Sequence, residues 1–354
     1  MKGLDVGIYA VSLGALGEHV AQSLAARGAR VSVRRPSQSW TLAWRLARRF
    51  VRSSVAARMA ARAGYERAFA VVAQREIARR AHDVVVTDLA VARGTGRVRG
   101  GRHVLILERG PAAAIHAALD AELDRAPAFA RHLRNFRASA AACARETEAI
   151  SGADRVLVPS LWIARAAGTR PHTVTVAPPH PRPVWWRGQY ARGRRLRVLV
   201  PGPLIGRNGA RPLLECARAM VGEIEVRVAG RVADDPQAVA PYAGLFEVAA
   251  GRFEDECAWA DVVVAPWLID GYCREVAVAL ASGIPTIATE ATGVDLTTPG
   301  VLVVDEGSTE ALVTAIAALR GDDVRAALPA PLFVREASQA ALGAEAAIAT
   351  AIAG

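Results

Sequence analysis

Short, almost entirely apolar runs alternate with longer segments of helical spacing along the whole chain, and this alternation constrains the fold more than any other feature. The first half contains DVGIYAV, RVSVRR, DVVVTD, HVLILE, RVLVPS and TVTVAP. The second half continues with LRVLVPGP, IEVRVAG, LFEVAAG, DVVVAP, PTIATE and VLVVDE. Apolar strands separated by helices are typical of parallel sheets that are covered on both faces. The alternation therefore predicts an α/β protein with two doubly wound parallel sheets.

Length and one proline-rich stretch set the predicted domain bounds. The chain has 354 residues, more than the roughly 250 to 300 at which a single core stops growing. The stretch APPHPRPVWWRGQYARGRR separates the two series of strands and is typical of a linker. We therefore predict a Rossmann-like domain over 1–178, a linker over 179–195 and a second Rossmann-like domain over 196–335. The alanine-rich end, 336–354, predicts a closing helix.

The loop SLGALGEHV follows the first predicted strand and opens a helix. Gly14 and Gly17 allow close approach of a ligand to the backbone, and the start of a helix favours an anion such as a phosphate. Ser12 stands where the dinucleotide fingerprint needs a glycine, and RVSVRRP ends the second strand with arginines instead of an acid for a ribose. An NAD-dependent dehydrogenase is therefore disfavoured. A tight turn without a ligand is the other interpretation of this loop.

Two loops of the second half carry further candidate residues. In PGPLIGRNGARPLLECA, Arg207 could bind a diphosphate through paired hydrogen bonds, although an arginine on a solvated loop fits equally well. In ADVVVAPWLIDGYCREVAVALASGIPTIATE, a strand leads through an acid and a glycine into a helix. We expect unsatisfied backbone N–H groups from Gly271 to Glu275 at that helix start. Asp270 could accept hydrogen bonds from sugar hydroxyls or cap the helix.

The second of these loops resembles the hallmark ADVFVLPSxxEGFGxxxxEAMAxGxPVIAT of the retaining glycosyltransferases of family 4. GADRVLVPSLWIARAAG, RVLVPGPLIGRNGARPLLECARAM and EVRVAGR resemble other motifs of that family. The resemblance covers most of residues 150–320 and covers 1–150 thinly. It implies the GT-B fold, in which two Rossmann-like domains face one another across an interdomain cleft. It also implies transfer of a hexose from a nucleotide-diphosphate sugar to an acceptor hydroxyl, with retention and without a metal or other cofactor.

The resemblance places the family's functional positions on particular residues of this chain. Asp270 matches the first acid of the family's pair, which faces the sugar, whereas the second acid falls on Val278. Glu275 lies three residues earlier on the same helix face and could replace the missing acid near the ribose. The family's phosphate-binding arginine and lysine fall on Pro203 and Asn208.

The predicted site follows from these matches. Arg207 remains as a positive charge in the first loop, and the nucleotide base is expected near the segment AAGRFEDE. We predict three catalytic residues, which are Asp270, Glu275 and Arg207. The predicted donor-binding residues are Gly14, Gly17, Asn208, Phe253, Gly271, Tyr272, Cys273 and Arg274.

Departures from the family pattern leave two other functions open. Val278, Pro203 and Asn208 also fit a catalytically degenerate protein that keeps the fold as a nucleotide-sugar-binding or partner subunit. An epimerase of a nucleotide sugar on the same architecture ranks last, because the sequence shows no clear set of acid and base residues for it.

The formal net charge of +10 suggests a basic surface that could bind an anionic partner. The segment 39–80 combines Trp40, Trp44 and Phe50 with many arginines, and it could form a basic amphipathic surface that meets anionic lipid and a lipid-linked acceptor. Solvated arginine faces on packed helices and a small soluble acceptor are equally compatible with it. Aromatic residues make up only 5% of the chain and form no stacking motif, which disfavours nucleic acid.

Segments and residues that would place the chain elsewhere in the cell are missing from the sequence. No apolar run reaches the roughly 18 residues of a membrane-spanning helix, and Asp5 and Glu18 make the start a poor signal peptide. Four separated cysteines predict reduced thiols and no metal site. We therefore predict a cytoplasmic protein, with peripheral contact to the inner face of the membrane as the open alternative.

Overall fold

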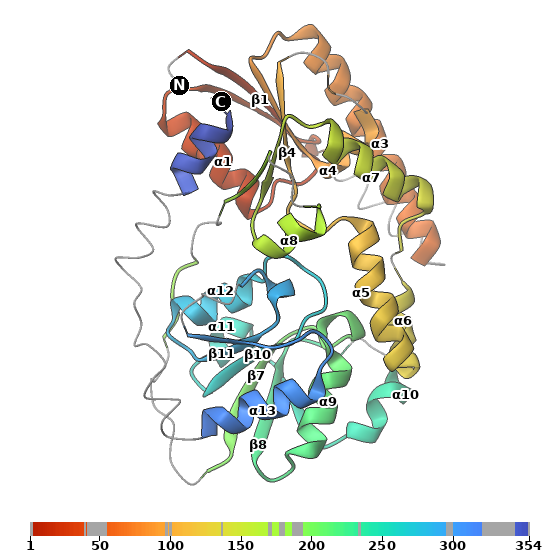
Figure 1. Ribbon diagram of the computed structural model, residues 1–354, viewed down its shortest axis with the longest axis vertical. Helices are drawn as coiled ribbons and strands as arrows, with labels where there is room; N and C mark the ends of the chain where they lie inside the picture. The colour runs from red at the N-terminus through yellow and green to blue at the C-terminus, as the bar shows by residue number, and fades with distance from the viewer. Residues whose placement is uncertain are drawn as a thin grey trace. The chain divides into compact units, whose positions relative to one another are not determined.

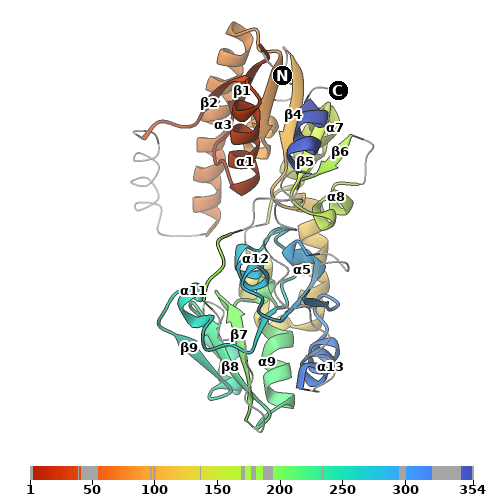
Figure 2. The same ribbon diagram turned by 90° about the vertical axis from the view of Figure 1, so that its left-hand side faces the viewer.

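The structure is a computed structural model, and the chain forms two compact units in it (Figures 1 and 2). Unit 1 comprises Met1–Ala114, Phe136–Pro179 and Ala340–Gly354, and unit 2 comprises Ile115–Asn135 and His180–Gln339. The described residues are 3–38, 40, 55–95, 98, 101–135, 137–168, 172–176, 181–185, 194–232, 235–294, 300–320 and 344–352, without the side chains of 55–60.

Unit 1 contains a parallel sheet of six strands in the order β2-β1-β3-β4-β5-β6. The strands are β1 (Asp5–Tyr9), β2 (Arg30–Arg34), β3 (Val84–Asp88), β4 (Arg102–Ile106), β5 (Arg155–Val158) and β6 (Thr173–Thr175). The helices between them are α1 (Ala15–Ala26), α3 (Val55–Arg79), α4 (Leu89–Thr95), α7 (Ala140–Gly152) and α8 (Leu161–Ala166). Each apolar run of the first half thus forms a strand of one sheet.

Alternation along the strands explains why helices cover both faces of this sheet. Val84 and Val86 pack into a cluster with Leu16 and Leu24 of α1, whereas Val85 packs into another cluster with Phe69 of α3. Successive side chains of a strand point to opposite faces, so a strand that is apolar throughout needs cover on both sides. The continuous apolar runs therefore produce the doubly wound arrangement.

Unit 2 contains a second parallel sheet of six strands, in the order β12-β11-β10-β7-β8-β9. The strands are β7 (Leu196–Pro201), β8 (Ile224–Ala229), β9 (Phe246–Ala249), β10 (Val262–Ala265), β11 (Thr286–Ala288) and β12 (Val301–Val303). Its helices and 3-10 turns are η2 (Gly206–Asn208), α9 (Ala210–Ala219), α10 (Pro236–Val239), η3 (Ala240–Tyr242), α11 (Phe253–Glu256), α12 (Arg274–Ala281), η4 (Glu290–Thr292) and α13 (Thr309–Arg320). The predicted α/β class with two parallel sheets is confirmed.

Three elements from the first half of the sequence pack on unit 2, namely α5 (Ala112–Arg125), η1 (Pro127–Phe129) and α6 (Ala130–Arg134). Glu122 of α5 is buried and accepts hydrogen bonds from Nε and Nη2 of Arg211, at 2.7 and 3.1 Å. Arg211 belongs to α9 and also donates to the Gly307 carbonyl at 2.6 Å. This buried ion pair assigns most of α5 to unit 2, although the sequence bounds placed it in the first domain.

The end of the chain packs on unit 1. Residues 344–352 are helical, and Ala344, Ile348 and Ile352 are buried in the same cluster as Val6 of β1. Arg102 Nη1 donates to the Ile352 carbonyl at 2.8 Å. The closing helix expected from the alanine-rich composition therefore completes the core of the first sheet.

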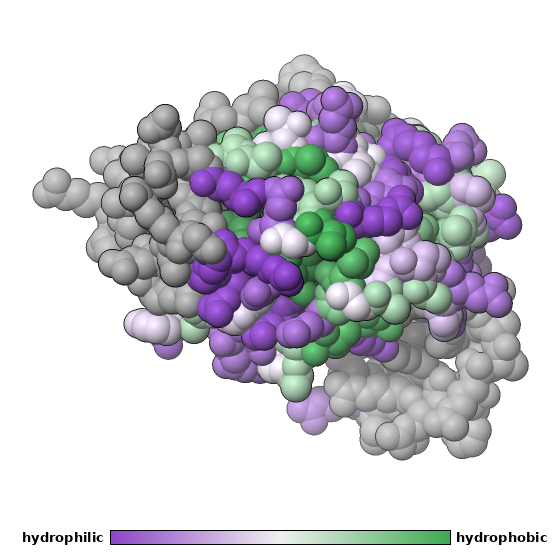
Figure 3. Space-filling model, turned by 90° about the horizontal axis from the view of Figure 1, so that it is seen from below, coloured by the Kyte–Doolittle hydropathy of each residue, from purple (hydrophilic) through white to green (hydrophobic). Residues whose placement is uncertain are grey.

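Within the described ranges, no helix combines the length and the apolar character that crossing a membrane requires. Figure 3 shows apolar residues in a strip between hydrophilic ones at the end of the molecule seen from below. In unit 2, Val221 between α9 and β8 is 64% exposed, and single exposed apolar side chains of this kind are ordinary.

Candidate functional site

The loop between β10 and α12 is fastened to η4 by backbone hydrogen bonds. Gly271 N–H donates to the Ala291 carbonyl and Cys273 N–H to the Thr292 carbonyl, both at 2.7 Å. Gly271 and Gly293 have φ of +96° and +93°, and a Cβ on Gly293 would lie 2.6 Å from the Gly271 carbonyl oxygen. Both positions therefore need glycine. Two of the backbone N–H groups that we expected to be open to a ligand are used by the fold.

The turn η2 lies against the same loop. Leu268 N–H donates to the Arg207 carbonyl at 3.0 Å. Gly209 has φ of +76°, and a Cβ there would collide with the Pro266 carbonyl. The strands that precede the two loops, β7 and β10, are neighbours in the sheet. Arg207 and Asp270, which the sequence suggested from separate motifs, therefore stand on adjoining loops at the carboxyl ends of two paired strands.

Asp270 and Glu275 form a pair of interacting carboxyl groups at this edge. Asp270 is half-buried, and burial together with the nearby Glu275 charge raises its pKa to about 7. Glu275 lies in the first turn of α12, where the Cys273 thiol donates to Oε2 at 3.7 Å. At neutral pH the Asp270 carboxyl can therefore both donate and accept hydrogen bonds. Burial also lowers the pKa of Arg207, which still remains charged.

Some predicted donor-binding residues are used by the fold of unit 2. Asn208 is buried, and its side-chain amide donates to the Pro203 carbonyl at 3.0 Å. Phe253 is buried in the hydrophobic cluster that contains Leu199 and Cys257. The amide therefore braces the turn between β7 and α9, and the ring belongs to the core instead of a surface on which a base could stack.

The three residues after Gly271 differ in burial and in the partners of their side chains. Cys273 is fully buried, and burial raises the pKa of its thiol well above the usual value. Arg274 is exposed but donates to Glu254 Oε1 of α11 at 2.7 Å, and this hydrogen bond lowers the pKa of Glu254. Tyr272 is half-buried, and burial raises its pKa to about 12. Cys273 and Arg274 are thus engaged by neighbouring side chains, and the third side chain is the Tyr272 phenol, which burial keeps neutral.

Val278, at the position of the family's second acid, faces the core. Its side chain is 1% exposed and packs with Val263 of β10 and Ile284. The side chain at position 278 therefore contacts the sheet and belongs to the core. Glu275 is therefore the carboxylate of α12 that stands next to Asp270.

Gly14 and Gly17 lie in unit 1, where the start of α1 already carries an anion from the protein itself. Glu108, two residues beyond β4, accepts hydrogen bonds at Oε1 from Leu16 N–H at 2.9 Å and Gly17 N–H at 3.2 Å. A Cβ on Gly14 would collide with this carboxylate. Burial raises the pKa of Glu108, and the backbone hydrogen bonds oppose the rise. The phosphate site that we expected at this helix start is therefore filled by Glu108.

Asp88, at the end of β3, fastens the same loop from another side. Its Oδ2 accepts from Val11 N–H at 2.7 Å and Ser12 N–H at 3.1 Å, and its Oδ1 accepts from Val91 N–H at 2.8 Å. Burial raises the pKa of Asp88 to about 6, against the opposing effect of these backbone hydrogen bonds. The sequence shows an acid at the end of the strand run DVVVTD, but two of its three partners lie 76 and 77 residues away.

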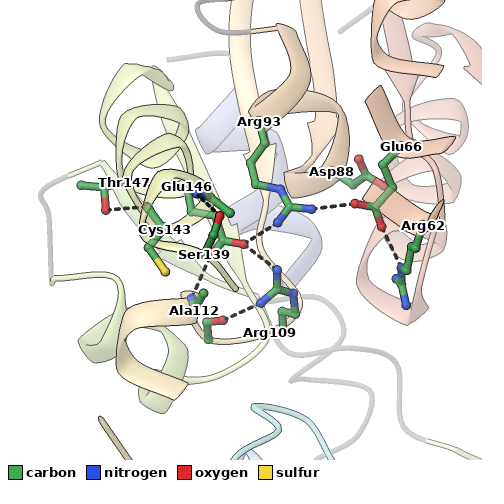
Figure 4. A network of polar contacts seen from close by, with 12 residues as sticks. Arg62, Glu66, Asp88, Arg93, Arg109, Ala112, Ser139, Cys143, Glu146 and Thr147 are labelled. Atoms are coloured by element: carbon green, nitrogen blue, oxygen red, sulfur yellow. Dashed lines mark hydrogen bonds and ion pairs between the residues drawn. The ribbon is translucent and has the colours of Figure 1, made fainter. Parts of the chain in front are cut away.

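A buried ion network joins the segments that follow β3 and β4 (Figure 4). Glu146 of α7 is 1% exposed and accepts from Arg93 Nη1 at 2.9 Å, Arg109 Nη2 at 2.7 Å and Ala112 N–H at 2.7 Å. Arg93 also bonds to Glu66 of α3 at 2.7 Å. Sequence reasoning missed this network, because single charged residues in alanine-rich helices give no sign of being buried.

Parts of the predicted partner surface and of the predicted linker lie outside the described residues. These are Trp44 and Phe50 of the basic segment and most of the predicted linker. Trp40 is described, and the centroid of its ring lies 6.3 Å from the centroid of the Tyr65 ring. Within the described part of the chain, no three His, Cys, Asp or Glu side chains are grouped closely enough to hold a metal ion.

Comparisons with known proteins show similarity of structure alone. No protein-family model matches the chain, and no curated protein matches it in sequence. HepE of Anabaena in complex with UDP and glucose superposes with a TM-score of 0.58, at 13% identity over 99% of both chains. The catalytic domain of starch synthase IV of Arabidopsis thaliana, bound to ADP and acarbose, gives 0.57 at 11% identity over 100% of both chains.

A third similar structure is the N-terminal domain of a trehalose-6-phosphate phosphatase of Candida albicans. It gives a TM-score of 0.57 at 11% identity, over 100% of this chain and 96% of that one. These identities are too low to transfer an activity. The chain has the α/β fold with two parallel sheets that GT-B glycosyltransferases share.

Proposed function

We propose that the protein is a glycosyltransferase that takes a hexose from a nucleotide-diphosphate sugar held on unit 2 and transfers it with retention and without a metal. The observation that carries this proposal is the meeting of the Arg207 turn with the Asp270 loop at the ends of β7 and β10. Ligands of doubly wound sheets bind beyond the carboxyl ends of the strands. The complexes of HepE with UDP-glucose and of starch synthase IV with ADP support a nucleotide sugar as the ligand.

In the proposed transfer, Arg207 acts at the step in which the bond between the sugar and the diphosphate breaks. The bond between the anomeric carbon and the phosphate oxygen breaks, and negative charge develops on the departing nucleoside diphosphate. The Arg207 guanidinium stabilises that charge, and its partial burial strengthens the effect because little water screens it. The acceptor oxygen bonds to the anomeric carbon on the same face, and its proton passes to the departing phosphate oxygen.

Asp270 and Glu275 position the donor in this scheme. Asp270 contacts the sugar hydroxyls, for which a carboxyl group that both donates and accepts is suited. Glu275, in the first turn of α12, contacts the ribose, and Tyr272 is the remaining side chain of the loop that can meet the ligand. The acceptor, a small molecule or a lipid-linked one, belongs to unit 1 in this proposal, in a cytoplasmic protein.

The test is nucleotide binding to two arginine variants. Isothermal titration calorimetry with UDP, ADP, GDP and their glucose conjugates should show binding by the unchanged protein. Arg207→Ala should weaken the best ligand by about tenfold to a hundredfold, because hydrogen bonds to charged groups contribute about 1.5–3 kcal/mol. Arg274→Ala is the matched control, since Arg274 is engaged by Glu254, and it should change the affinity less than about threefold. Equal losses in the two variants, or no binding by the unchanged protein, would contradict the proposal.

A second candidate function is a binding or partner subunit that no longer transfers sugar. It is favoured by Val278, which replaces the second acid and is buried in the core, and by Asn208, whose amide is used by Pro203. This candidate predicts donor binding of ordinary affinity without release of nucleoside diphosphate over long incubation. Slow hydrolysis of the donor, abolished by Arg207→Ala, would instead support the transferase.

A further inference from the structure

The outer face of α3 carries a hollow of about 440 Å³ lined largely by arginines. The described residues that line it are Val72, Arg75, Glu76 and Arg79 in the C-terminal part of the helix and Arg80 directly after it. All of them belong to unit 1. The hollow therefore belongs to a different unit of the chain from the candidate donor site.

The charges around the hollow do not balance. Among the described residues that line the hollow, Glu76 is the single acid, and its carboxylate forms ion pairs with Arg34 Nε at 2.8 Å and with Arg80 Nε at 3.3 Å. Arg75 and Arg79 are exposed, and neither forms an ion pair with any described residue. In the same unit, the arginines of the Glu146 network share buried carboxylates. The hollow thus presents an excess of positive charge that the described fold does not neutralise.

Helix stability alone does not account for this arrangement. Cations in the last turn of a helix are favoured by its dipole, which explains Arg79 at the end of α3. Arg75 lies one turn earlier, and two like charges at positions i and i+4 repel one another and destabilise a helix. An anion bound between them would remove that repulsion. Its place would be the hollow that both residues line.

We propose that the hollow on α3 binds a phosphate group through Arg75, Arg79 and Arg80. Guanidinium groups match the geometry of phosphate oxygens with paired hydrogen bonds. Glu76 holds Arg80 in place, and Val71 and Val72, each 43% exposed, supply apolar surface beside the charges. A phosphate that is esterified to a small apolar or alcohol group fits this chemistry. It could belong to a soluble phosphomonoester or to the headgroup of an anionic lipid.

The experiment measures two probes with the full chain. Calorimetry with glycerol 1-phosphate reports the soluble source, and sedimentation with vesicles of phosphatidylglycerol and phosphatidylcholine, against phosphatidylcholine alone, reports the lipid source. The test variant is R75Q/R79Q. The matched control is R30Q/R131Q, which removes the same charge at two exposed arginines that do not line the hollow. Circular dichroism and thermal unfolding verify that both variants are folded.

We expect the unchanged protein and the control to bind at least one probe, and the R75Q/R79Q variant to bind it at least tenfold more weakly. Binding of glycerol 1-phosphate identifies a soluble ligand, and binding only of vesicles that contain phosphatidylglycerol identifies a lipid headgroup. The proposal is overturned if neither probe binds, or if the control loses as much affinity as the test variant. Neither readout depends on sugar transfer, so the outcome is independent of the proposed enzymatic function.

Discussion

The two parallel sheets have similar architecture, but different groups hold the loops at the carboxyl ends of their strands. In unit 1, Asp88, Glu108 and Glu146 accept hydrogen bonds from the loops and helices that follow β1, β3 and β4. In unit 2, the loops after β7 and β10 are joined mainly by backbone hydrogen bonds. Unit 1 thus supplies its own anions at this edge, whereas in unit 2 a pair of carboxyl groups, Asp270 and Glu275, and the arginine Arg207 stand on the loops and the helix start that follow β7 and β10.

This difference shows that a parallel sheet does not by itself create a binding site. The N–H groups at the start of α1 are equally ready for a phosphate or for a carboxylate of the protein. Glu108 fills that place in unit 1. Which edge binds a ligand is therefore decided by the residues that arrive from distant parts of the chain.

The largest expected effect is a loss of stability when the Glu146 carboxylate of unit 1 is removed. Glu146→Ala should lower the free energy of unfolding by about 3–5 kcal/mol, because Arg93 would lose a buried partner and Ala112 N–H an acceptor. The measurement is urea unfolding followed by circular dichroism. Thr147→Ala is the control, since its exposed hydroxyl donates only to the Cys143 carbonyl, and it should cost less than about 1 kcal/mol. Similar losses in the two variants would mean that the network contributes little to stability.

A smaller effect is expected at Glu108, and it tests the comparison directly. Glu108→Ala should cost about 1–3 kcal/mol of stability, because Leu16 and Gly17 N–H groups lose their acceptor. The affinity for a nucleoside diphosphate, measured by calorimetry, should not change, because the proposed diphosphate site is on unit 2. Glu18→Ala removes an exposed carboxylate from the same helix and is the control. A tenfold change in affinity with Glu108→Ala alone would show that α1 takes part in donor binding.

The smallest expected effect depends on pH and lies at Asp270. Its pKa in the folded protein is about 7, above its ordinary value of 3.8, so the unfolded chain ionises first as the pH rises. The wild-type protein therefore loses stability between about pH 4 and pH 7 through this group, and above that range the loss is constant. Asp270→Asn removes the loss and should be more stable than wild type by about 1–2 kcal/mol at about pH 8, after allowance for solvent screening.

The advantage of Asp270→Asn should vanish below about pH 4, where Asp270 of the wild type is protonated in the folded and in the unfolded protein. Urea unfolding at the two pH values measures it, with the exposed Asp124→Asn as the control for loss of one charge. An equal advantage at both pH values would show that Asp270 is not held in its protonated form by its surroundings.

The fold could be predicted from the sequence because its information is local. Each apolar run became a strand, since continuous apolar character is satisfied only when both faces are buried. Arg207, Asp270 and Gly271 could be identified for the same reason, because a strand followed by a glycine turn places them at the carboxyl edge. The burial of Phe253 and Asn208 could not be inferred from the pattern, because it depends on neighbours from other elements.

The sequence by itself determined the strands, the helices between them and the loops at which side chains meet the carboxyl edge. Only the tertiary structure decided that Glu122 and Arg211 assign α5 to unit 2, that residues 344–352 complete the core of unit 1, and that Glu108 occupies the start of α1. The physical reason is the range of the forces involved. Hydrophobic periodicity is read over a few neighbouring residues, whereas a buried charge selects its partner across 89 or 92 residues of chain.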